Sequence, residues 1–272
     1  MRLSMLVGIS EAIRLLLIIA RKKKKMNLTN CSSSANTKRK NLNEWLAGLI
    51  DGDGCFQLSK KGYASLEIIL STRDKNCLYQ IKDRFGGSIK EKQGNKYLRY
   101  RLHNKKGLLN LINAVNGLIR NPNRLLQLSQ LATKYNINIK NPCKLTYNNG
   151  WFAGFMDSDG SIYLNIDSVQ IFISASQKNK LLLDPLVELY GGKVYILTKV
   201  QAFKWVVYKK EEILNLLKYF EKNPLLSKKQ HRIKLIKNIY YSFSKSEHKA
   251  PIETIQGKNW ENLLRKWFCF AD

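Results

Sequence analysis

The segment Leu46-Ala-Gly-Leu-Ile-Asp-Gly-Asp-Gly54 recurs in the second half of the chain as Phe152-Ala-Gly-Phe-Met-Asp-Ser-Asp-Gly160. At nearly the same spacing, Gly86-Gly87 returns as Gly191-Gly192. A unit of this length that occurs twice is typical of a duplicated domain rather than a solenoid of short repeats. We therefore predict one copy over residues 41–140 and a second copy over residues 141–245.

Each copy has the sequence pattern of an α+β domain. A short apolar helix opens it, over residues 44–50 or 151–156, and a strand follows in which Phe56 and Leu58 are predicted to face inward. Further strands come in pairs, and the Gly-Gly pair is a helix end signal, so the predicted order is αββαββαα. Paired strands form an antiparallel sheet. We therefore predict two such sheets. Each is expected to have helices on one face and a solvent-exposed, basic surface on the other.

The charge of the chain indicates a polyanionic partner. The 272 residues include 47 Lys and Arg against 20 Asp and Glu, which gives a formal charge of +27. Nucleic acid is the first candidate partner and a membrane surface the second. The composition, with 44% hydrophobic residues, excludes collagen-like, disulfide-scaffold and wholly disordered proteins.

Residues suited to zinc sites or to Ser-His-Asp triads are scarce. The five cysteines form no Cys-x-x-Cys pair, which is typical of a protein from a reducing compartment. The histidines are only His103, His231 and His248. These counts argue against a zinc nuclease and against a triad hydrolase.

Residues 1–40 are predicted to be a basic leader or arm. The apolar stretch within residues 5–20 is interrupted by Glu11 and Arg14, so we expect no stable membrane insertion. Residues 21–40 carry many lysines and arginines and no acid. Three interpretations stay open: a solvated arm, a mitochondrial presequence, and a functional start at Met26. Residues 246–272 are predicted to form a C-terminal tail.

The two opening helices are predicted to pack against each other. Small side chains allow two helix backbones to approach closely. The motif provides them in both copies, and we predict that they form the interface about a pseudo-twofold axis: Ala47, Gly48, Ala153 and Gly154.

Acidic residues end both helices, where the negative end of the helix dipole disfavours a carboxylate. A polar turn explains one such segment but not two at matched positions. A bound cation explains both, and oxygen donors suit Mg²⁺. We predict a metal site made by Asp53, Asp159 and the carbonyls of Gly52 and Ser158. Asp51 and Asp157 are instead expected to bond nearby backbone groups.

Strand alternation predicts which side chains face away from the core. A solvated sheet face explains any single lysine in this set, but it explains poorly why polar and cationic residues dominate both copies, with Glu67 an exception. Gln and Asn can bond adenine and Arg can bond guanine. The predicted DNA-binding residues are Gln57, Ser59, Lys61, Arg99, Arg101, His103, Tyr163, Asn165, Gln170, Lys193, Lys204 and Tyr208.

The paired nine-residue motif resembles that of the LAGLIDADG homing endonucleases, and the resemblance covers about residues 41–245. It implies a monomer that imitates a dimer, with two saddle-like sheets in the DNA major groove. It also implies that Asp53 and Asp159 hold a catalytic Mg²⁺ over the scissile phosphate. The implied function is intron homing through double-strand breaks with short 3′ overhangs at a long site, and the implied location is the mitochondrion or the chloroplast.

The resemblance also implies a lysine before the final helix of each copy. Lys229 is the best match in the second copy, whereas Pro122 stands at the expected position in the first. Arg120 or Arg124 would supply charge there, but arginine does not exchange a proton near neutral pH. Two rival functions stay open: an intron maturase that binds RNA, with or without DNA cleavage, and a DNA-binding regulator. The survival of both motif acids argues against the regulator.

Overall fold

The computed structural model describes residues 40–92, 94 and 96–269, so the predicted leader lies outside the described residues apart from Lys40. Residues 40–53 are helical. The first copy continues with β1 (Gly54–Leu58), β2 (Ala64–Ser71), η1 (Thr72–Asp74), α2 (Lys75–Phe85), β3 (Ser88–Glu91), β4 (Tyr97–Leu102), α3 (Lys105–Val115) and α4 (Pro122–Lys134). The second copy comprises α5 (Trp151–Asp159), β5 (Gly160–Asn165), β6 (Gln170–Gln177), η2 (Lys180–Leu182), α6 (Asp184–Tyr190), β7 (Lys193–Leu197), η3 (Thr198–Val200), β8 (Ala202–Val207), α7 (Lys210–Lys222) and α8 (Lys229–Ser244). Two elements follow it, η4 (Glu247–Lys249) and α9 (Ile255–Phe268).

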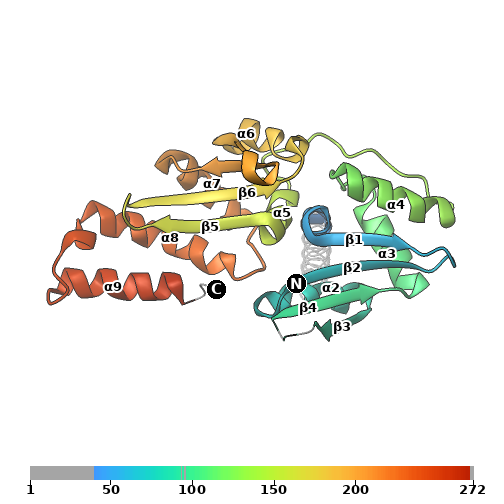
Figure 1. Cartoon of the computed structure of the whole chain (residues 1–272), viewed down its shortest axis with the longest axis horizontal. Helices are drawn as coiled ribbons and strands as arrows, with labels where there is room; N and C mark the ends of the chain where they lie inside the picture. Colours follow the sequence, from blue (N-terminus) through green and yellow to red (C-terminus); the bar gives the residue numbers. More distant parts are fainter. Residues whose placement is uncertain (1–39, 93, 95, 270–272) are drawn as a thin grey trace, which may run out of the picture. The chain divides into compact units, whose positions relative to one another are not determined.

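Each copy contains one four-stranded sheet (Figure 1). The strand order is β1-β2-β4-β3 in the first sheet and β5-β6-β8-β7 in the second, and all neighbouring strands are antiparallel. The predicted order αββαββαα and the α+β class are confirmed. Both sheets therefore present their strands in the same sequence of neighbours, as a duplication requires.

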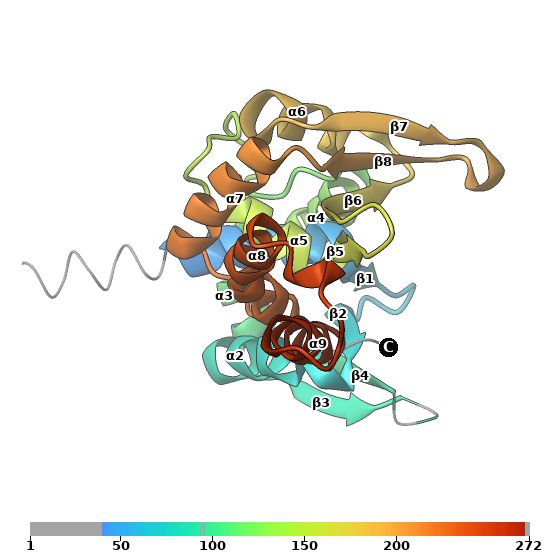
Figure 2. The same ribbon diagram turned by 90° about the vertical axis from the view of Figure 1, so that its left-hand side faces the viewer.

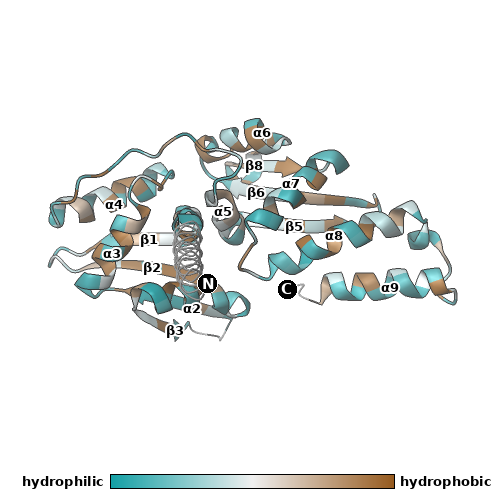
Figure 3. Ribbon diagram, turned by 180° about the vertical axis from the view of Figure 1, so that it is seen from behind, coloured by the Kyte–Doolittle hydropathy of each residue, from teal (hydrophilic) through white to brown (hydrophobic). Residues whose placement is uncertain are grey.

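The core of each copy lies between its sheet and its helices. Alternate strand residues such as Leu66 and Tyr100 are buried, and so are residues of the covering helices such as Leu111. The helices are amphipathic: along α7 and α8, Figure 3 shows both hydrophobic and hydrophilic segments. The apolar stripe of such a helix is stabilised by burial against the sheet. None of the described helices is both long and apolar enough to cross a membrane.

The repeated Gly-Gly pair lets the chain turn closely under the sheet. Gly87 and Gly192 have φ values of +93° and +80°, in the region that favours glycine. A Cβ atom on Gly87 would lie 2.7 Å from the carbonyl oxygen of Arg101. The pair thus ends α2 and α6 and starts the next strand, as the sequence predicts.

Two local predictions need correction. Leu58 has the inward parity of Phe56 and pairs with the buried Ala64, but it is 37% exposed, because it is the last residue of β1, beside the hairpin. The helix that the second Gly-Gly pair ends was expected to start at about Asn179, but it begins only at Asp184, since η2 comes first and Pro185 lies in the first turn of α6. Proline is well placed in the first turn of a helix and poorly placed further inside.

The predicted C-terminal tail contains a well-packed helix. α9 packs along α8, and the two helices lie beside each other in Figure 2. Trp267 is 1% exposed, and the guanidinium of Arg232 on α8 lies 5.8 Å from its ring centroid. Residues 246–269 therefore extend the second copy rather than trailing from it.

Candidate functional site

The two motif helices are packed with almost no space between their backbones. A Cβ atom on Gly48 would collide with the carbonyl oxygen of Trp151, and one on Gly154 would collide with the carbonyl oxygen of Trp45. Ala47 and Ala153 beside them are also buried. The four small residues predicted for this interface lie in it, and glycine is required at two of them because any side chain would push the helices apart.

The first acid of each motif is buried and hydrogen-bonded by the protein. Asp51 accepts bonds from the backbone N–H groups of Arg120 and Asn121, at 2.8 and 3.1 Å. Asp157 accepts equivalent bonds from Leu226 and Ser227, at 2.8 and 3.1 Å. Each carboxylate thus holds the segment that leads into the last helix of its own copy, as expected from the sequence.

Each of these carboxylates also binds a tryptophan of the other copy. The indole Nε1–H of Trp151 donates to Asp51 at 2.7 Å, and that of Trp45 donates to Asp157 at 2.7 Å. Sequence reasoning missed this exchange, since the two members of the pairs are 100 and 112 positions apart. Burial raises the pKa of Asp51 to about 6, and the hydrogen bonds oppose that shift.

The second acids, Asp53 and Asp159, end the two helices and lie close together. A Cβ atom on Gly52 would collide with the carboxylate of Asp159, so the end of the first helix touches the end of the second. Asp159 is half-buried and Asp53 keeps a solvent-facing surface. Desolvation by the surrounding protein, reinforced by the charge of Asp53, raises the pKa of Asp159 to about 7. Desolvation also raises the pKa of Asp53, against the charges of Lys229 and Arg124.

Lys229 stabilises the end of the second motif helix. Its Nζ donates to the carbonyl oxygens of Met156, Asp157 and Ser158, at 2.9, 2.9 and 3.1 Å. These bonds engage the three protons of the ammonium group, and cations are favoured at a helix C-terminus. Burial lowers the pKa of Lys229, while four nearby aspartates oppose that shift. In the described geometry the lysine holds the helix end beside Asp159.

The first-copy counterpart of Lys229 is Arg124, not Pro122. The Nη2 atom of Arg124 donates to the carbonyl oxygen of Gly52 at 3.2 Å, as Lys229 does to that of Ser158. Pro122 is instead the first residue of α4, where its missing N–H costs nothing. Of the two arginines that the sequence offered for this charge, Arg124 is the one that bonds the end of the first motif helix. The first half-site therefore keeps a fixed positive charge.

Gln177 is a site residue that sequence reasoning missed. Its Nε2 donates to Asp159 at 2.6 Å from the end of β6. The β-strand register places Leu70 at the matching position of β2, so the first copy has no amide there. The sequence offered only one signal for Gln177, a side-chain amide at the end of a predicted strand. Such amides are too common to identify a site residue.

The donor atoms at the two helix ends suit a hard divalent cation. Two carboxylates whose pKa values are raised by desolvation, one of them also by the other's charge, are better stabilised by a cation than by each other. The carbonyls of Gly52 and Ser158 stand beside them, and each has a second lone pair besides the one used by Arg124 or Lys229. Among the described residues no cluster of three or more His, Cys, Asp or Glu exists, so any such ion takes carbonyl or water oxygens as well.

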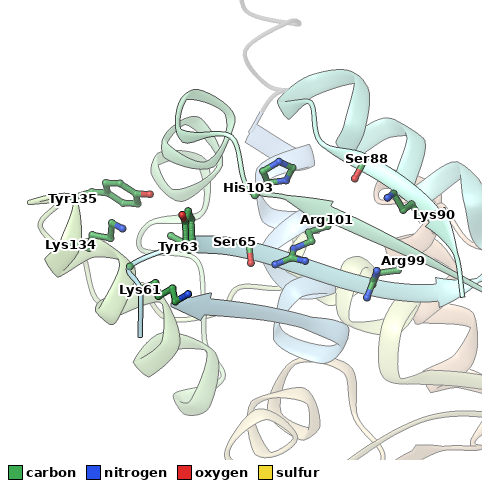
Figure 4. A pocket seen from close by; sticks show the side chains of 12 residues that line it. Lys61, Tyr63, Ser65, Ser88, Lys90, Arg99, Arg101, His103, Lys134 and Tyr135 are labelled. Atoms are coloured by element: carbon green, nitrogen blue, oxygen red, sulfur yellow. The ribbon is translucent and has the colours of Figure 1, made fainter. Parts of the chain in front are cut away.

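The outer face of the first sheet is a cationic groove. The groove has a volume of about 660 Å³. Figure 4 shows Arg99 and Arg101 side by side on β4, with the other side chains converging from β3, the β1–β2 hairpin and the end of α4. Its lining contains no acid: Lys61, Gly62, Tyr63, Ala64, Ser65, Ser88, Lys90, Arg99, Arg101, His103, Lys134 and Tyr135. Four of the predicted binding residues line it, whereas Lys90, Lys134 and Tyr135 were missed because the folded chain brings them from separate elements.

The remaining predicted binding residues also lie on the outer faces. Gln57 and Ser59 are exposed on or just after β1. In the second sheet the register pairs Tyr163 with Phe172 and Asn165 with Gln170, so these side chains share one face. Lys193, Lys204 and Tyr208 belong to that face as well, because residues of the opposite parity on β8, Trp205 and Val207, are buried.

The sequence matches the LAGLIDADG endonuclease family over residues 46–135 and again over residues 152–240. The chain belongs to the LAGLIDADG endonuclease family. Both matched segments contain one motif helix, one sheet and the helices that follow it. The family resemblance noted from the paired motif is thereby confirmed.

Curated relatives in the family are intron-encoded proteins. The chain is 43% identical over 232 residues to the intron-encoded RNA maturase bI4 of Saccharomyces cerevisiae, which covers 83% of this chain and 36% of that protein. It is 36% identical to the probable intron-encoded endonuclease aI2 of Debaryomyces hansenii, over 88% of this chain and 39% of that protein. The chain therefore spans less than two fifths of the length of these two relatives. It is 38% identical to the intron-encoded DNA endonuclease ai2a of Dictyostelium discoideum, over 84% of this chain and 75% of that protein.

Solved LAGLIDADG structures share the fold. The homing endonuclease I-LtrWI bound to target DNA aligns with a TM-score of 0.62 at 18% identity, over 86% of this chain and 98% of that one. The meganuclease I-SmaMI bound to uncleavable DNA aligns with a TM-score of 0.65 at 17% identity, over 85% and 99%. At such identities the likeness establishes the two-sheet fold.

Proposed function

We propose that this LAGLIDADG protein is an intron-encoded DNA endonuclease that makes double-strand breaks at a long recognition site. The observation that carries the proposal is the pair Asp53 and Asp159, brought together by two helices that glycine allows to touch. A duplex has two scissile phosphates, and a duplicated carboxylate at a pseudo-twofold interface provides one acid for each. The family membership and the intron-encoded relatives support the same activity.

The proposed cofactor is Mg²⁺, held by Asp53, Asp159 and the carbonyls of Gly52 and Ser158. When bound, such an ion activates water and offsets charge on the phosphate. The chain's own residues keep the two carboxylates in place: Gln177 bonds Asp159, and Lys229 and Arg124 fix the helix ends. Lys229 is proposed to act on the reaction through this positioning and through its charge, since its ammonium protons are already engaged.

The proposed DNA contacts are the outer faces of the two sheets. The groove that contains Arg99 and Arg101 is cationic and has no acid in its lining, although Glu67 outside the lining lies 4.0 Å from Arg99, so it suits the phosphate backbone and guanine edges of a major groove. On the second sheet, Asn165, Gln170 and Lys204 supply amide and ammonium donors. A monomer with two such faces is expected to read an almost asymmetric site. The mitochondrion is the proposed location, on the basis of the intron-encoded relatives.

Point substitutions at the paired acids test the proposal. Asp53→Asn and Asp159→Asn should each abolish double-strand cleavage of a duplex that carries the intron-insertion site, while binding in a gel-shift assay stays largely intact. Asp83→Asn, an exposed acid on α2, is the matched control for loss of one charge. Cleavage should need Mg²⁺ and stop on chelation. If either acid variant cuts both strands at the normal rate, the site is assigned wrongly.

A second function, as an intron RNA maturase, is favoured by the similarity to the maturase bI4. It predicts that intron RNA competes with duplex DNA for the protein at the same salt concentration. Adding the protein to a splicing reaction should then raise the yield of joined exons. Binding of the duplex without cleavage in any divalent cation would move this function to first place.

A further inference from the structure

The outer faces of the two sheets differ at one matched row of residues. In the first copy the row crosses β1 and β2 at the pair Gln57 and Ser65, and His103 continues it directly after β4. In the second copy the same row is Tyr163 and Phe172, a paired position on β5 and β6, with Tyr208 directly after β8. We call these three side chains the aromatic row. A polar row in one copy has an aromatic counterpart in the other.

The rings of the aromatic row are stacked on one another. Tyr163 and Phe172 have ring centroids 4.7 Å apart and planes inclined by 6°, and Phe172 and Tyr208 have centroids 6.1 Å apart. The Nζ atom of Lys204 lies 5.3 Å from the centroid of Tyr163 and covers one end of the row. Tyr208 stands at the other end. Tyr208 lines a groove, so a further flat ring can pack at that end of the row.

A groove of about 550 Å³ opens at that end. It lies where the β5–β6 hairpin, the start of α7 and the last turns of α8 meet. We call it the end groove, and its lining is Val169, Gln170, Ile171, Tyr208, Lys209, Lys210, Tyr240, Phe243, Ser244 and His248. The matched elements of the first copy line the cationic groove of Figure 4, with His103 in the place of Tyr208 and with Lys134 and Tyr135 at the end of α4.

The end groove combines flat rings with cations. Lys209 and Lys210 are exposed at its rim, and no lining residue is acidic, although Lys209 lies 4.0 Å from Glu212 outside the lining. The Nζ atom of Lys210 lies 5.4 Å from the ring centroid of Tyr240. Behind them the ring of Phe243 packs on His248 and Trp260, with centroids 5.3 and 5.5 Å away, so this wall is braced by the C-terminal segment. Gln170 adds an amide that can bond a base edge.

These features suit an unpaired nucleotide better than a paired one. A base inside a duplex is stacked on both faces and cannot reach a ring that stands at the end of a row. An unpaired base can stack on such a ring, and proteins that bind single strands combine aromatic platforms with cations for the backbone. We propose that the end groove binds an unpaired nucleotide of a single-stranded nucleic acid, with its base against the rings of Tyr208 and Tyr240 and its phosphate at Lys209 and Lys210.

The proposal goes beyond duplex cleavage, and its test separates the two. Labelled single-stranded oligonucleotides of one mixed sequence, as RNA and as DNA, are titrated with the full chain at fixed salt and followed by fluorescence anisotropy. Tyr240→Leu keeps an apolar side chain but removes the ring, and Lys210→Gln removes a rim charge. Tyr241→Ala is the matched control, because Tyr241 is 62% exposed on the same helix and does not line the groove.

Tyr240→Leu should weaken single-strand binding roughly 5- to 100-fold, the range for losing one base–aromatic stack. Lys210→Gln should weaken it less and reduce its salt dependence, while Tyr241→Ala should bind like the unchanged chain. None of the three should alter the rate of duplex cleavage, and Asp53→Asn should leave single-strand binding intact. RNA bound more tightly than DNA identifies RNA as the ligand, and equal affinity identifies the unpaired base and phosphate. The proposal is overturned if neither single strand binds, or if Tyr240→Leu and Lys210→Gln bind as the control does.

Discussion

The indole N–H of Trp45 donates a hydrogen bond to the carboxylate of Asp157 across the interface between the two copies, at 2.7 Å. Trp151 makes the equivalent bond to Asp51, so each copy holds the buried acid of the other. The same carboxylates fix the segments that carry Arg124 and Lys229 toward the helix ends. Interface packing and the geometry of Asp53 and Asp159 are therefore coupled through two hydrogen-bonded carboxylates.

This coupling predicts a stability cost for losing the indole donor. Trp45→Phe should lower the free energy of unfolding by about 1–3 kcal/mol beyond the loss of ring volume, because a buried carboxylate loses a partner. Trp205→Phe is the control, since the indole of Trp205 donates to the neutral carbonyl of Gly191 at 2.8 Å and the ring is equally buried. Its hydrogen-bond loss should be about 0.5–1.5 kcal/mol. Urea unfolding of both variants measures these two losses in the free energy of unfolding. Equal losses would contradict the coupling.

The raised pKa of Asp159 predicts how stability depends on pH and metal. Its pKa of about 7 lies above its ordinary value of 3.8, so the folded chain holds a proton that the unfolded chain releases. This contribution to stability is complete below about pH 4 and is lost as the pH rises through 7. A divalent cation competes with that proton. Mg²⁺ should therefore raise the melting temperature more at pH 8 than at pH 5.5.

Thermal melting with and without Mg²⁺ at the two pH values measures this difference. Asp159→Asn should reduce the pH dependence of the metal effect, whereas Asp83→Asn should leave it unchanged. A metal-induced shift that is the same at both pH values in the unchanged chain would argue against a shared proton and metal site at Asp159.

Arg101 should contribute to base preference rather than to general affinity. It lies near the end of β4 in the cationic groove, with its side chain exposed. Arg101→Ala should cost about 1–3 kcal/mol on the preferred site and relax specificity at one position, if the guanidinium bonds a guanine. Lys134→Ala at the groove edge should weaken all duplexes alike and reduce the salt slope by roughly 0.9. Equal, sequence-independent losses in titrations of a site library would refute base readout by Arg101.

The sequence predicted the elements that repeat and missed those that depend on distant partners. The paired motif, the Gly-Gly turns and strand alternation are local patterns, so the αββαββαα order, the interface glycines and the outer face of each sheet could be read from them. Leu58 was assigned to the core because alternation gives the face of a strand residue but not its exposure at the end of the strand. The bonds of Trp45 and Gln177 could not be predicted, because they join residues whose proximity depends on the packing of complete elements.

The position of Arg124 is the most consequential difference for mechanism. Loop alignment placed Pro122 opposite Lys229 and left Arg120 or Arg124 to supply the charge of the first half-site. In the folded chain Arg124 bonds the carbonyl of Gly52 as Lys229 bonds that of Ser158. The two half-sites are thus alike in charge but differ in bonding, because Lys229 holds three carbonyls and Gln177 bonds only Asp159.

This difference predicts that the two DNA strands are cut at different rates. The strand served by Asp159 and Lys229 should be cut faster, since its carboxylate is held by more bonds and misplacement of a catalytic group by a fraction of an ångström slows a reaction. Nicked duplex should then accumulate before linear product in a time course on strand-labelled substrate. Lys229→Met should slow that strand preferentially, because the end of α5 loses three hydrogen bonds.

Arg124→Lys provides the matched comparison for the other strand. Lysine keeps the charge but loses the planar fork that reaches Gly52, so only the strand served by Asp53 should slow. Melting temperatures of both variants show whether slower cutting reflects partial unfolding. Simultaneous cutting of both strands in the unchanged chain, or equal slowing of both strands by Lys229→Met, would mean that the two helix ends act as one rigid unit. The bonding differences at Lys229 and Gln177 would then contribute to stability and not to the order of cleavage.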